Sequence, residues 1–477
     1  MSATEDIGTR YLGREWESAP ATFEVRNPAN GEVVARVADC GAEEARRAAD
    51  VAVEAFESWR RTTAFERSAI LERWAALMLE RQEELARTMT SEMGKPIKEA
   101  RGEVAYAAGF VKWYAEEAKR VAGETIQSQF GHKRLFALKQ PVGPVFAVTP
   151  WNFPLAMVTR KAAPALAAGC TFVLKPAEQS PLSSLLAADL WREAGGPEGT
   201  LQVLPAKDPV PVATALMADP RIRKVTFTGS TEVGRILYRQ AADTVKRISL
   251  ELGGHAPLIV FDDADLEVAV RQSVACKFRN AGQTCVCANR IYVQKGIAEE
   301  FTREFAEASR ALKVGDPMAE DTDIGPLVDA QGLAKVRSHL DDALSKGARV
   351  VAGGNGLEGL YFQPTVVTDV TADMLMMREE TFGPVAPLVT FEEEAEAVRL
   401  ANDSPYGLAA YLFTNDVSRA FRVAEALDYG IVGLNDGVPA TPQAPFGGVK
   451  QSGVGREGGH WGIEEYLEVK YLSVGLR

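Results

Sequence analysis

One cysteine of the chain has neighbours that favour a reactive thiol. Cys285 lies in the segment 280–287, Asn-Ala-Gly-Gln-Thr-Cys-Val-Cys, whose small and polar side chains would leave its sulfur accessible. An accessible thiolate is a strong nucleophile that attacks electrophilic carbon and forms a covalent intermediate. A structural or redox cysteine is the alternative interpretation, because unpaired cysteines are among the most buried residue types.

Two other polar residues have the chemistry to assist a nucleophile. Glu251 lies between two leucines and is followed by two glycines. Desolvation there would raise its pKa and suit it to general-base catalysis, whereas the alternative is an exposed glutamate at the end of a strand. Asn152 lies between Trp151 and Phe153 in a segment bounded by prolines, so it is either a rigid amide donor or a turn residue.

Two glycine patterns resemble nucleotide-binding motifs but lack the required context. Gly453, Gly455 and Gly458 have G-x-G-x-x-G spacing, yet no predicted strand precedes them and too little chain follows for a βαβ unit. Gly229 and Gly234 have the gap of a phosphate-binding loop, but Arg and Ile follow where Lys and Ser or Thr are required. A strand–glycine–helix turn at Gly229 remains, and its free N–H groups favour an anion or a dipole.

Short β-rich runs alternate with helical runs from about residue 141. The predicted strands are 145–149, 171–174, 201–204, 225–228 and 258–261, and the predicted helices between them are 156–168, 183–193 and 232–241. This alternation predicts parallel strands with right-handed crossovers, which is a doubly wound α/β sheet. Residues 150–152, 175–178 and 229–230 each follow a predicted strand, so we expect a cleft at the carboxyl edge of this sheet.

The remaining segments predict a second α/β region and an extension. The N-terminal third is predicted to be helical, with one amphipathic run from Leu71 to Met89 that Gly94 ends. A second alternation of strands and helices follows Gly254 and continues to about Asn435. Residues 127–139 are typical of a hairpin, and the β-rich tail 465–474 has the composition to pair with another subunit.

The composition is that of an ordinary globular protein with an acidic balance. The 477 residues include 53 basic and 65 acidic side chains, a net charge of −12, and 46% are hydrophobic. This charge argues against a nucleic-acid partner, and the longest apolar run, 162–174, is too short to cross a membrane. Five cysteines and a polar segment 1–10 favour a cytoplasmic protein without a disulfide framework or secretory leader. The four histidines are scattered and no cysteine pairs have zinc spacing, so no metal site is predicted.

Seven segments together resemble the aldehyde dehydrogenase superfamily, in its order and spacing over nearly the whole chain: 150–154, 175–178, 227–230, 251–254, 282–285, 380–384 and 445–448. The resemblance implies an α/β fold with a Rossmann-like cofactor domain, a second α/β catalytic domain and a small β oligomerisation arm. It implies an NAD-binding domain at 1–121 and 141–252, to which part of 442–461 returns, a catalytic domain at 253–441, and an arm at 122–140 and 462–477. A homodimer or homotetramer is expected.

The resemblance also implies a chemical role for each of the three polar residues. Cys285 would add to an aldehyde carbonyl, and the oxyanion would be held by the Asn152 amide and the main-chain N–H of Cys285. Hydride would leave this adduct for a nicotinamide ring. Glu251 would then activate the water that hydrolyses the thioester to a carboxylic acid.

The implied cofactor is NAD, with NADP possible. Lys175 and Glu178 match positions that reach the adenosine ribose, where a carboxylate accepts hydrogen bonds from both hydroxyls and repels a 2′-phosphate. Glu178 therefore favours NAD, while Lys175 leaves the use of NADP open. The other expected cofactor contacts are Trp151, Ala177, Gly229, Ser230, Leu252, Glu380 and Phe382.

Within the family, the segments 277–280, 284–287, 379–384 and 449–453 are similar to those of succinate-semialdehyde dehydrogenases. Arg160 and Arg279 match arginines that hold the substrate's carboxylate, a task that suits the planar guanidinium, although either one alone would be a surface arginine. A serine expected in the same pocket aligns with Ala440, and the neighbouring Thr441 is the candidate substitute.

The expected reaction is the oxidation of succinate semialdehyde, or of a close ω-carboxy aldehyde, to the carboxylic acid. Glutarate semialdehyde and a broad range of aldehydes are the alternatives within the class. A non-catalytic binding or structural protein on the same fold is the alternative from a different class. The small-molecule aldehyde is thus the expected partner.

Cys287 lies two residues beyond the expected nucleophile. We hypothesise that Cys285 and Cys287 form a strained disulfide under oxidising conditions. Such a bond would remove the nucleophile and return it on reduction, which makes a reversible off-switch.

Overall fold

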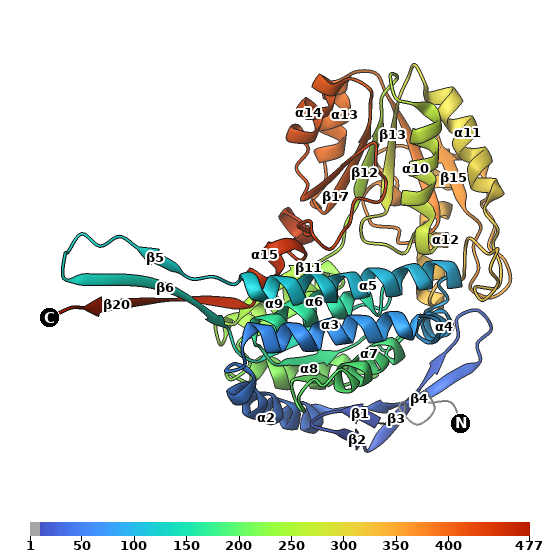
Figure 1. Ribbon diagram of the computed structural model, residues 1–477. Coiled ribbons are helices and arrows are strands. Elements are labelled where there is room, and N and C mark those ends of the chain that lie inside the picture. The colour runs from blue at the N-terminus through green and yellow to red at the C-terminus, as the bar shows by residue number, and fades with distance from the viewer. Residues whose placement is uncertain (1–9) are drawn as a thin grey trace.

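A computed structural model describes residues 10–477 of the chain (Figure 1). It contains two large sheets with helices packed on them and a long, thin arm of three strands. The expected absence of a secretory leader concerns residues 1–10, and 1–9 lie outside the described residues. Within the described part, no helix has the length and apolar character needed to cross a membrane.

The first sheet has eight strands in the order β19-β11-β10-β7-β8-β9-β1-β2. Its strands are β1 (Arg10–Leu12), β2 (Trp16–Ser18), β7 (Val145–Val148), β8 (Phe172–Lys175), β9 (Leu201–Val203), β10 (Lys224–Thr228), β11 (Arg247–Glu251) and β19 (Gly453–Val454). The five strands from β7 to β11 are parallel, and the strand order reverses between β7 and β10. This confirms the predicted doubly wound sheet, in which ligands bind at such a reversal point.

Both faces of the first sheet are buried, which is why its strands are apolar almost throughout. Val145 and Ala147 of β7 face the cluster that includes α3–α7, while Phe146 between them faces the cluster of α2, α8 and α9. The helices are α2 (Ala42–Trp59), α3 (Ala64–Glu80), α4 (Gln82–Met93), α5 (Ile97–Glu117), α6 (Ala156–Ala168), α7 (Leu182–Glu193), α8 (Pro209–Ala218) and α9 (Thr231–Ala242).

The second sheet has seven strands in the order β14-β15-β16-β13-β12-β17-β18, all parallel except β14. The strands are β12 (Ala256–Val260), β13 (Ala288–Gln294), β14 (Arg349–Ala352), β15 (Thr365–Thr368), β16 (Val385–Phe391), β17 (Ala409–Phe413) and β18 (Ile431–Leu434). The helices that flank it are α10 (Leu266–Phe278), α11 (Ala298–Ala311), α12 (Ala330–Ser345), α13 (Glu394–Asn402) and α14 (Val417–Ala426).

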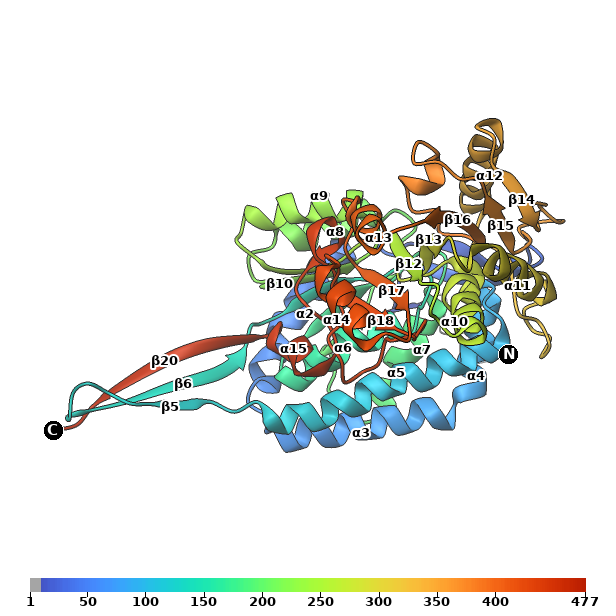
Figure 2. The same cartoon turned by 90° about the horizontal axis from the view of Figure 1, so that it is seen from above.

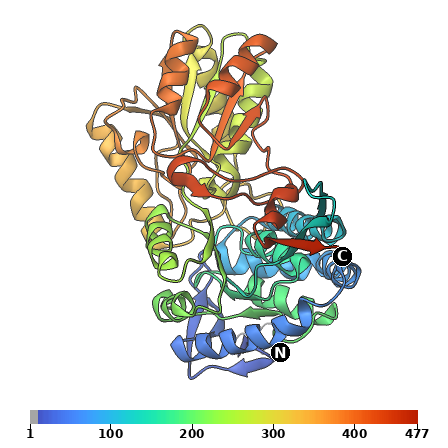
Figure 3. The ribbon, with the colours of Figure 1, turned by 90° about the vertical axis from the view of Figure 1, so that its left-hand side faces the viewer.

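The two sheets meet end to end (Figure 3). Cys285 precedes β13 and Glu380 precedes β16, so both lie at the amino ends of neighbouring strands of the second sheet. These ends face the carboxyl ends of the first sheet's strands. After β18 the chain returns to the first sheet, where β19 pairs antiparallel with β11, and it continues through α15 (Gly459–Glu464). The predicted domain boundaries stay predictions.

The arm is a three-stranded antiparallel sheet in the order β20-β6-β5, which projects away from both large sheets (Figure 2). Its strands are β5 (Glu124–Ile126), β6 (Lys133–Pro141) and β20 (Leu467–Gly475). The prediction of a hairpin over 127–139 was wrong in its first half, because 127–132 form the connection and the first strand is 124–126. The tail is a strand as predicted, but it pairs with β6 of its own chain.

The N-terminal third is less helical than predicted. Residues 10–39 form β1, β2 and the hairpin of β3 (Ala21–Arg26) with β4 (Val33–Asp39), whose alternating burial pattern is typical of one buried face. The predicted single run over 71–89 is two helices, because Arg81 leaves the helical conformation between α3 and α4. Gly94 ends α4 in the left-handed conformation, as its sequence position indicated.

Candidate active site

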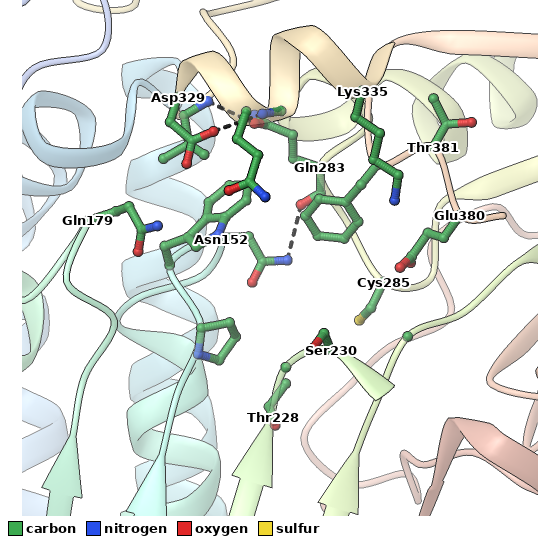
Figure 4. Close-up of a pocket in the computed structure, with 18 of the residues that line it drawn as sticks. Asn152, Gln179, Thr228, Ser230, Gln283, Cys285, Asp329, Lys335, Glu380 and Thr381 are labelled. Carbon is green, nitrogen blue, oxygen red and sulfur yellow. Dashed lines mark hydrogen bonds between the residues drawn. The ribbon is translucent and has the colours of Figure 1, made fainter. Parts of the chain in front are cut away.

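A cavity of about 370 Å³ lies at the point where the strand order of the first sheet reverses (Figure 4). Loops after β7 and β10 supply Asn152, Gly229 and Ser230 from one side, as predicted for the carboxyl edge. Cys285 and Glu380 come from the second sheet on the other side. The cavity therefore brings together eight of the residues selected from the sequence: Trp151, Asn152, Gly229, Ser230, Leu252, Cys285, Glu380 and Phe382.

Cys285 lies in a turn between α10 and β13, and its sulfur points into the cavity (Figure 4). The turn is reached through a short 3-10 segment in which Asn280 and Ala281 have positive φ angles of 52° and 55°. Gly254 allows the close approach of this turn, since a Cβ there would lie 2.4 Å from the carbonyl oxygen of Cys285. Burial raises the pKa of the Cys285 thiol to about 12, and Arg160 opposes that rise. Burial therefore favours the neutral thiol over the thiolate.

Asn152 lies in the loop between β7 and α6, with its amide turned toward the nucleophile's segment (Figure 4). Its Nδ2 donates to the carbonyl oxygen of Gln283 at 3.0 Å. Its Oδ1 is buried and has no hydrogen-bond partner among residues 10–477. The amide is thus held beside Cys285 with capacity for a further polar contact.

Glu251 is the last residue of β11 and only 4% exposed, in register with Thr228 of β10 and Gly453 of β19. Burial raises its pKa well above the ordinary value, and the neighbouring carboxylate of Glu457 raises it further. Glu457 pairs with Lys161, so the carboxyl groups of Glu251 and Glu457 and the ammonium of Lys161 form one buried cluster. A carboxyl with a raised pKa is the kind of group that accepts a proton near neutral pH.

The side chains expected to contact the nicotinamide half of a cofactor line the same cavity. Ser230 caps α9 by accepting the N–H of Val233, so the strand–glycine–helix turn predicted at this place is present. Glu380 accepts the N–H of Gly254 at 3.2 Å, and burial raises its pKa to about 7. Phe382 packs edge-on against Trp151, with ring centroids 5.6 Å apart.

The residues expected at the adenosine ribose lie further along the same edge, after β8. Gln179 lines the cavity. Lys175 is the last residue of β8 and Ala177 and Glu178 lie on the loop after it, and none of these three is among the described residues that line the cavity. The ammonium of Lys175 pairs with Glu178 Oε2 at 2.9 Å, and the Glu178 side chain is 39% exposed. A ribose hydroxyl placed there would meet both a carboxylate and an ammonium.

A second cavity, of about 340 Å³, is also lined by Cys285. Arg160 of α6 and Arg279 at the end of α10 both line it, as expected for a carboxylate clamp. The rest of its wall is formed by Glu99, Gly102, Glu103, Tyr106, Phe153, Met157, Thr284, Val286, Val438, Ala440 and Phe446. Ala440, which aligns with the expected serine, lines this cavity. Thr441, the candidate substitute for that serine, is not among the described residues that line it.

The two arginines differ in their surroundings. Arg160 is 2% exposed, pairs through Nε with Glu457 at 2.8 Å and packs over the ring of Phe446, with 3.9 Å to its centroid. Its Nη2 is buried without a hydrogen-bond partner among residues 10–477. Arg279 is half-buried and stacks over Phe153 at 5.3 Å from the ring centroid. A buried cation with an unused donor is well suited to bind an anion.

Cys287 is held away from Cys285 by its own contacts. All five cysteines are unpaired, and Cys287 is 1% exposed. Its sulfur lies 3.3 Å from the ammonium of Lys277 and donates to the carbonyl oxygen of the same residue at 3.2 Å. A bond to Cys285 would require Cys287 to leave these contacts, and the disulfide switch stays a prediction.

Sequence reasoning missed two sets of residues at this site. Glu457 and Lys161 surround Glu251, but they are far apart in the chain and neither belongs to a recognisable motif. Asp329, Gln331 and Lys335 come from the start of α12, and they line the cofactor cavity on the side opposite Ser230 (Figure 4). The one local signal for Glu457 in the sequence is that it is a charged residue within the glycine-rich segment 453–459.

A half-buried thiol and an amide lie at the strand-order reversal, together with a buried carboxylate, and this combination is typical of enzymes that use covalent thiol catalysis. Residues 16–472 match the Aldehyde dehydrogenase family. The chain belongs to this family, whose members are NAD(P)-dependent oxidoreductases acting on aldehydes.

Several relatives match over nearly their whole length. The glutarate-semialdehyde dehydrogenase of Pseudomonas putida is 52% identical over 98% of this chain and 97% of that protein. The NADP(+)-dependent succinate-semialdehyde dehydrogenase of Escherichia coli is 53% identical over 98% and 97%. The crystal structure of succinate-semialdehyde dehydrogenase from Burkholderia pseudomallei has a TM-score of 0.97 at 50% identity and covers 99% of each chain.

Proposed function

We propose that the protein oxidises an ω-carboxy aldehyde, succinate semialdehyde in the first place, to the corresponding diacid. The observation that carries this proposal is that Arg160 and Arg279 line one cavity together with Cys285. An aldehyde carbon at the sulfur and a carboxylate at the guanidinium groups would then be two ends of one small molecule. Glutarate semialdehyde is the second candidate, because a relative of that name is equally similar.

The cavity at the first sheet fits the nicotinamide half of NAD(P). The first turn of α9, after Gly229, offers main-chain N–H groups suited to a phosphate, and Glu380 offers a buried carboxylate suited to a ribose hydroxyl. When bound, NAD(P) supplies a hydride acceptor. Trp151, Leu252 and Phe382 would hold the ring next to Cys285 and exclude water.

Cys285 begins the reaction by adding its sulfur to the aldehyde carbon. The thiol proton passes to water as the C–S bond forms, and Glu251 keeps its carboxylate for the second half of the reaction. The carbonyl oxygen gains a negative charge, which the Asn152 amide and the main-chain N–H of Cys285 stabilise. A preorganised donor at this place stabilises the transition state more than the ground state.

The second half of the reaction frees Cys285. Loss of hydride from the adduct leaves a thioester on the sulfur. Glu251 takes a proton from water, the water oxygen attacks the thioester carbon, and the C–S bond breaks to release the carboxylic acid. The raised pKa of Glu251 makes its carboxylate a stronger base than an exposed glutamate.

Arg279→Leu should weaken the preference for an ω-carboxylate. Charge-assisted hydrogen bonds contribute about 1.5–3 kcal/mol, so kcat/KM for succinate semialdehyde should fall roughly 10- to 150-fold. Butanal has the same chain length without the carboxylate, and its kcat/KM should stay close to the wild-type value. Arg279 is the better choice than Arg160, because Arg160 also pairs with Glu457 beside Glu251.

The matched control is Arg303→Leu, which removes an exposed arginine on α11. Equal losses for succinate semialdehyde and butanal in Arg279→Leu would contradict the carboxylate clamp. The same assays on the wild-type enzyme with glutarate semialdehyde decide between the two candidate substrates through the ratio of kcat/KM values.

We also propose that NAD is preferred over NADP, since Glu178 would repel a 2′-phosphate. Glu178→Gln should raise the ratio of kcat/KM for NADP to that for NAD by about tenfold, which is about 1.4 kcal/mol. The substitution also frees the ammonium of Lys175, its partner at 2.9 Å, to bind the phosphate. Glu193→Gln, a half-exposed carboxylate at the end of α7, is the control. An unchanged ratio in Glu178→Gln would remove this basis for NAD preference.

The arm is proposed to join two or more copies of the chain. β20 is an edge strand, and Val469, Tyr471 and Leu472 on it are 67%, 60% and 44% exposed. Exposed edges that carry large apolar side chains are typical of subunit contacts. Val469→Asp with Tyr471→Asp should therefore shift the species to lower mass in light scattering. Phe65→Asp, which changes a 72% exposed residue of α3, should not, and an unchanged mass in the arm variant would contradict the proposal.

A further inference from the structure

A buried ion pair lies directly behind the loop that carries Asn152. The side chains of Lys95 and Glu103 are 0% and 1% exposed, and they pair with each other. Lys95 lies at the corner between α4 and α5, where Gly94 has a φ of 80°. A Cβ on Gly94 would lie 2.6 Å from Cγ of Pro326, so only glycine allows the packing that turns Lys95 inward.

The ion pair contacts both ends of the segment 152–156. The ammonium of Lys95 donates to the main-chain carbonyl oxygen of Asn152 at 2.8 Å and lies 3.7 Å from the ring centroid of Phe153. Oε1 of Glu103 accepts the N–H groups of residues 155 and 156 at 3.0 and 3.1 Å, where α6 begins. The pair therefore fixes the peptide of residue 152 from one side and the start of the next helix from the other.

A second donor holds the same carbonyl from the nucleophile's segment. Nδ2 of Asn280 donates to the Asn152 carbonyl oxygen at 3.1 Å and to that of Gln283 at 3.3 Å. Nδ2 of Asn152 also donates to the Gln283 carbonyl oxygen. The main chain of Asn152 is thus clamped between Lys95 and Asn280, while its side chain faces the segment that carries Cys285.

We propose that Lys95, held by Glu103, is a positioning residue that fixes the oxyanion-binding amide of Asn152. The proposal rests on the role of Asn152 proposed above. An oxyanion donor acts only if it is held at hydrogen-bond distance from the place where the negative charge develops. The peptide of Asn152 sets the direction of its side chain, and a buried ammonium with a matched carboxylate holds that peptide more firmly than water would.

The test is a double-mutant cycle in the full-length enzyme. Lys95→Met with Glu103→Gln removes both charges together, so no unpaired charge stays buried, and an amide oxygen remains for the N–H groups of α6. With NAD saturating, kcat/KM for succinate semialdehyde should fall about 10- to 100-fold, while the Kd for NAD stays unchanged. In the Asn152→Ala background the same two substitutions should change kcat/KM by less than about twofold, because the amide that they position is absent.

A second variant keeps the test independent of folding. Lys95→Gln with Glu103→Gln retains a neutral donor, so its kcat/KM should lie between the wild-type value and that of the Met variant. Glu92→Gln is the matched control: Glu92 is 1% exposed and accepts the N–H groups of Leu182 and Ser183 at the start of α7, not those of the segment 152–156. It should keep the wild-type kcat/KM.

Three results would overturn the proposal, and they differ from one another. An equal loss with and without Asn152 would make the ion pair purely structural. A shift in the pH dependence of Cys285 alkylation by iodoacetamide would mean that Lys95 acts on the thiol instead. If Asn152→Ala alone left kcat/KM unchanged, the proposed role of Asn152 would fail, and the positioning role with it.

Discussion

Cys285→Ser should lower kcat for the aldehyde by about 10⁴-fold or more, with the Kd for NAD unchanged. Serine preserves the size of the side chain and the turn before β13, so the loss would come from chemistry. A serine hydroxyl is much less acidic than a thiol and a weaker nucleophile toward a carbonyl carbon. The measurement is the rate of reduced-cofactor formation, with calorimetry for NAD binding.

The control for this variant is two residues away. Cys287→Ser replaces a sulfur that contacts Lys277 and does not line either cavity among the described residues, so its kcat should stay close to wild type. Wild-type enzyme quenched during turnover should carry an acyl group on Cys285 in a peptide mass spectrum. A Cys285→Ser enzyme with normal kcat would contradict the covalent mechanism.

Glu251→Gln should stop the reaction after its first half. Each active site should form about one reduced cofactor in a fast burst, after which the steady-state rate should be about 10²- to 10⁴-fold below wild type, as expected for loss of a general base. The acyl group should accumulate on Cys285, because glutamine cannot take a proton from water. A glutamine variant with neither a burst nor an accumulated acyl group would place the role of Glu251 before hydride loss.

The pH dependence of deacylation follows from the same residue. Glu251 acts as a base only when ionised, and burial together with Glu457 raises its pKa, so the rate should fall as the pH is lowered through that raised pKa. Glu457→Gln removes the negative neighbour and leaves Lys161 and Arg160, which both lower the pKa of Glu251. The acidic limb of kcat should therefore move to lower pH. A shift to higher pH would contradict this assignment.

The first sheet could be predicted from the sequence because its signals are local. Helix α6 matches its predicted bounds, and the predicted strands over 145–149 and 225–228 differ from β7 and β10 by one residue. The two strands are short apolar runs and the helix is a longer one, and each ends at a turn, so length and turn residues distinguish them. The loops after parallel neighbours must then share an edge, which predicts that Asn152 and Ser230 lie together.

The parts that escaped prediction depend on contacts across the chain. Glu457 and Lys161 are 296 positions apart in the sequence, and Lys95 and Asn152 are 57 apart. No periodicity or turn pattern predicts a contact between residues so far apart. The resemblance to a family supplied the order of the motifs, but not which buried charges would gather behind them. The hairpin predicted over 127–139 begins at Glu124 in the structure, because alternation alone does not distinguish a strand from the connection beside it.

The late return of the chain to the first sheet has a consequence for biosynthesis. β19 and Glu457 are made after every other part of the site, and β19 is the strand that pairs with the end of β11. A ribosome-bound chain therefore contains Cys285 and Glu251 before the residues that become the final neighbours of Glu251 have been made. The buried charged cluster around Glu251 is thus the last part of the site to be assembled as the chain is synthesised.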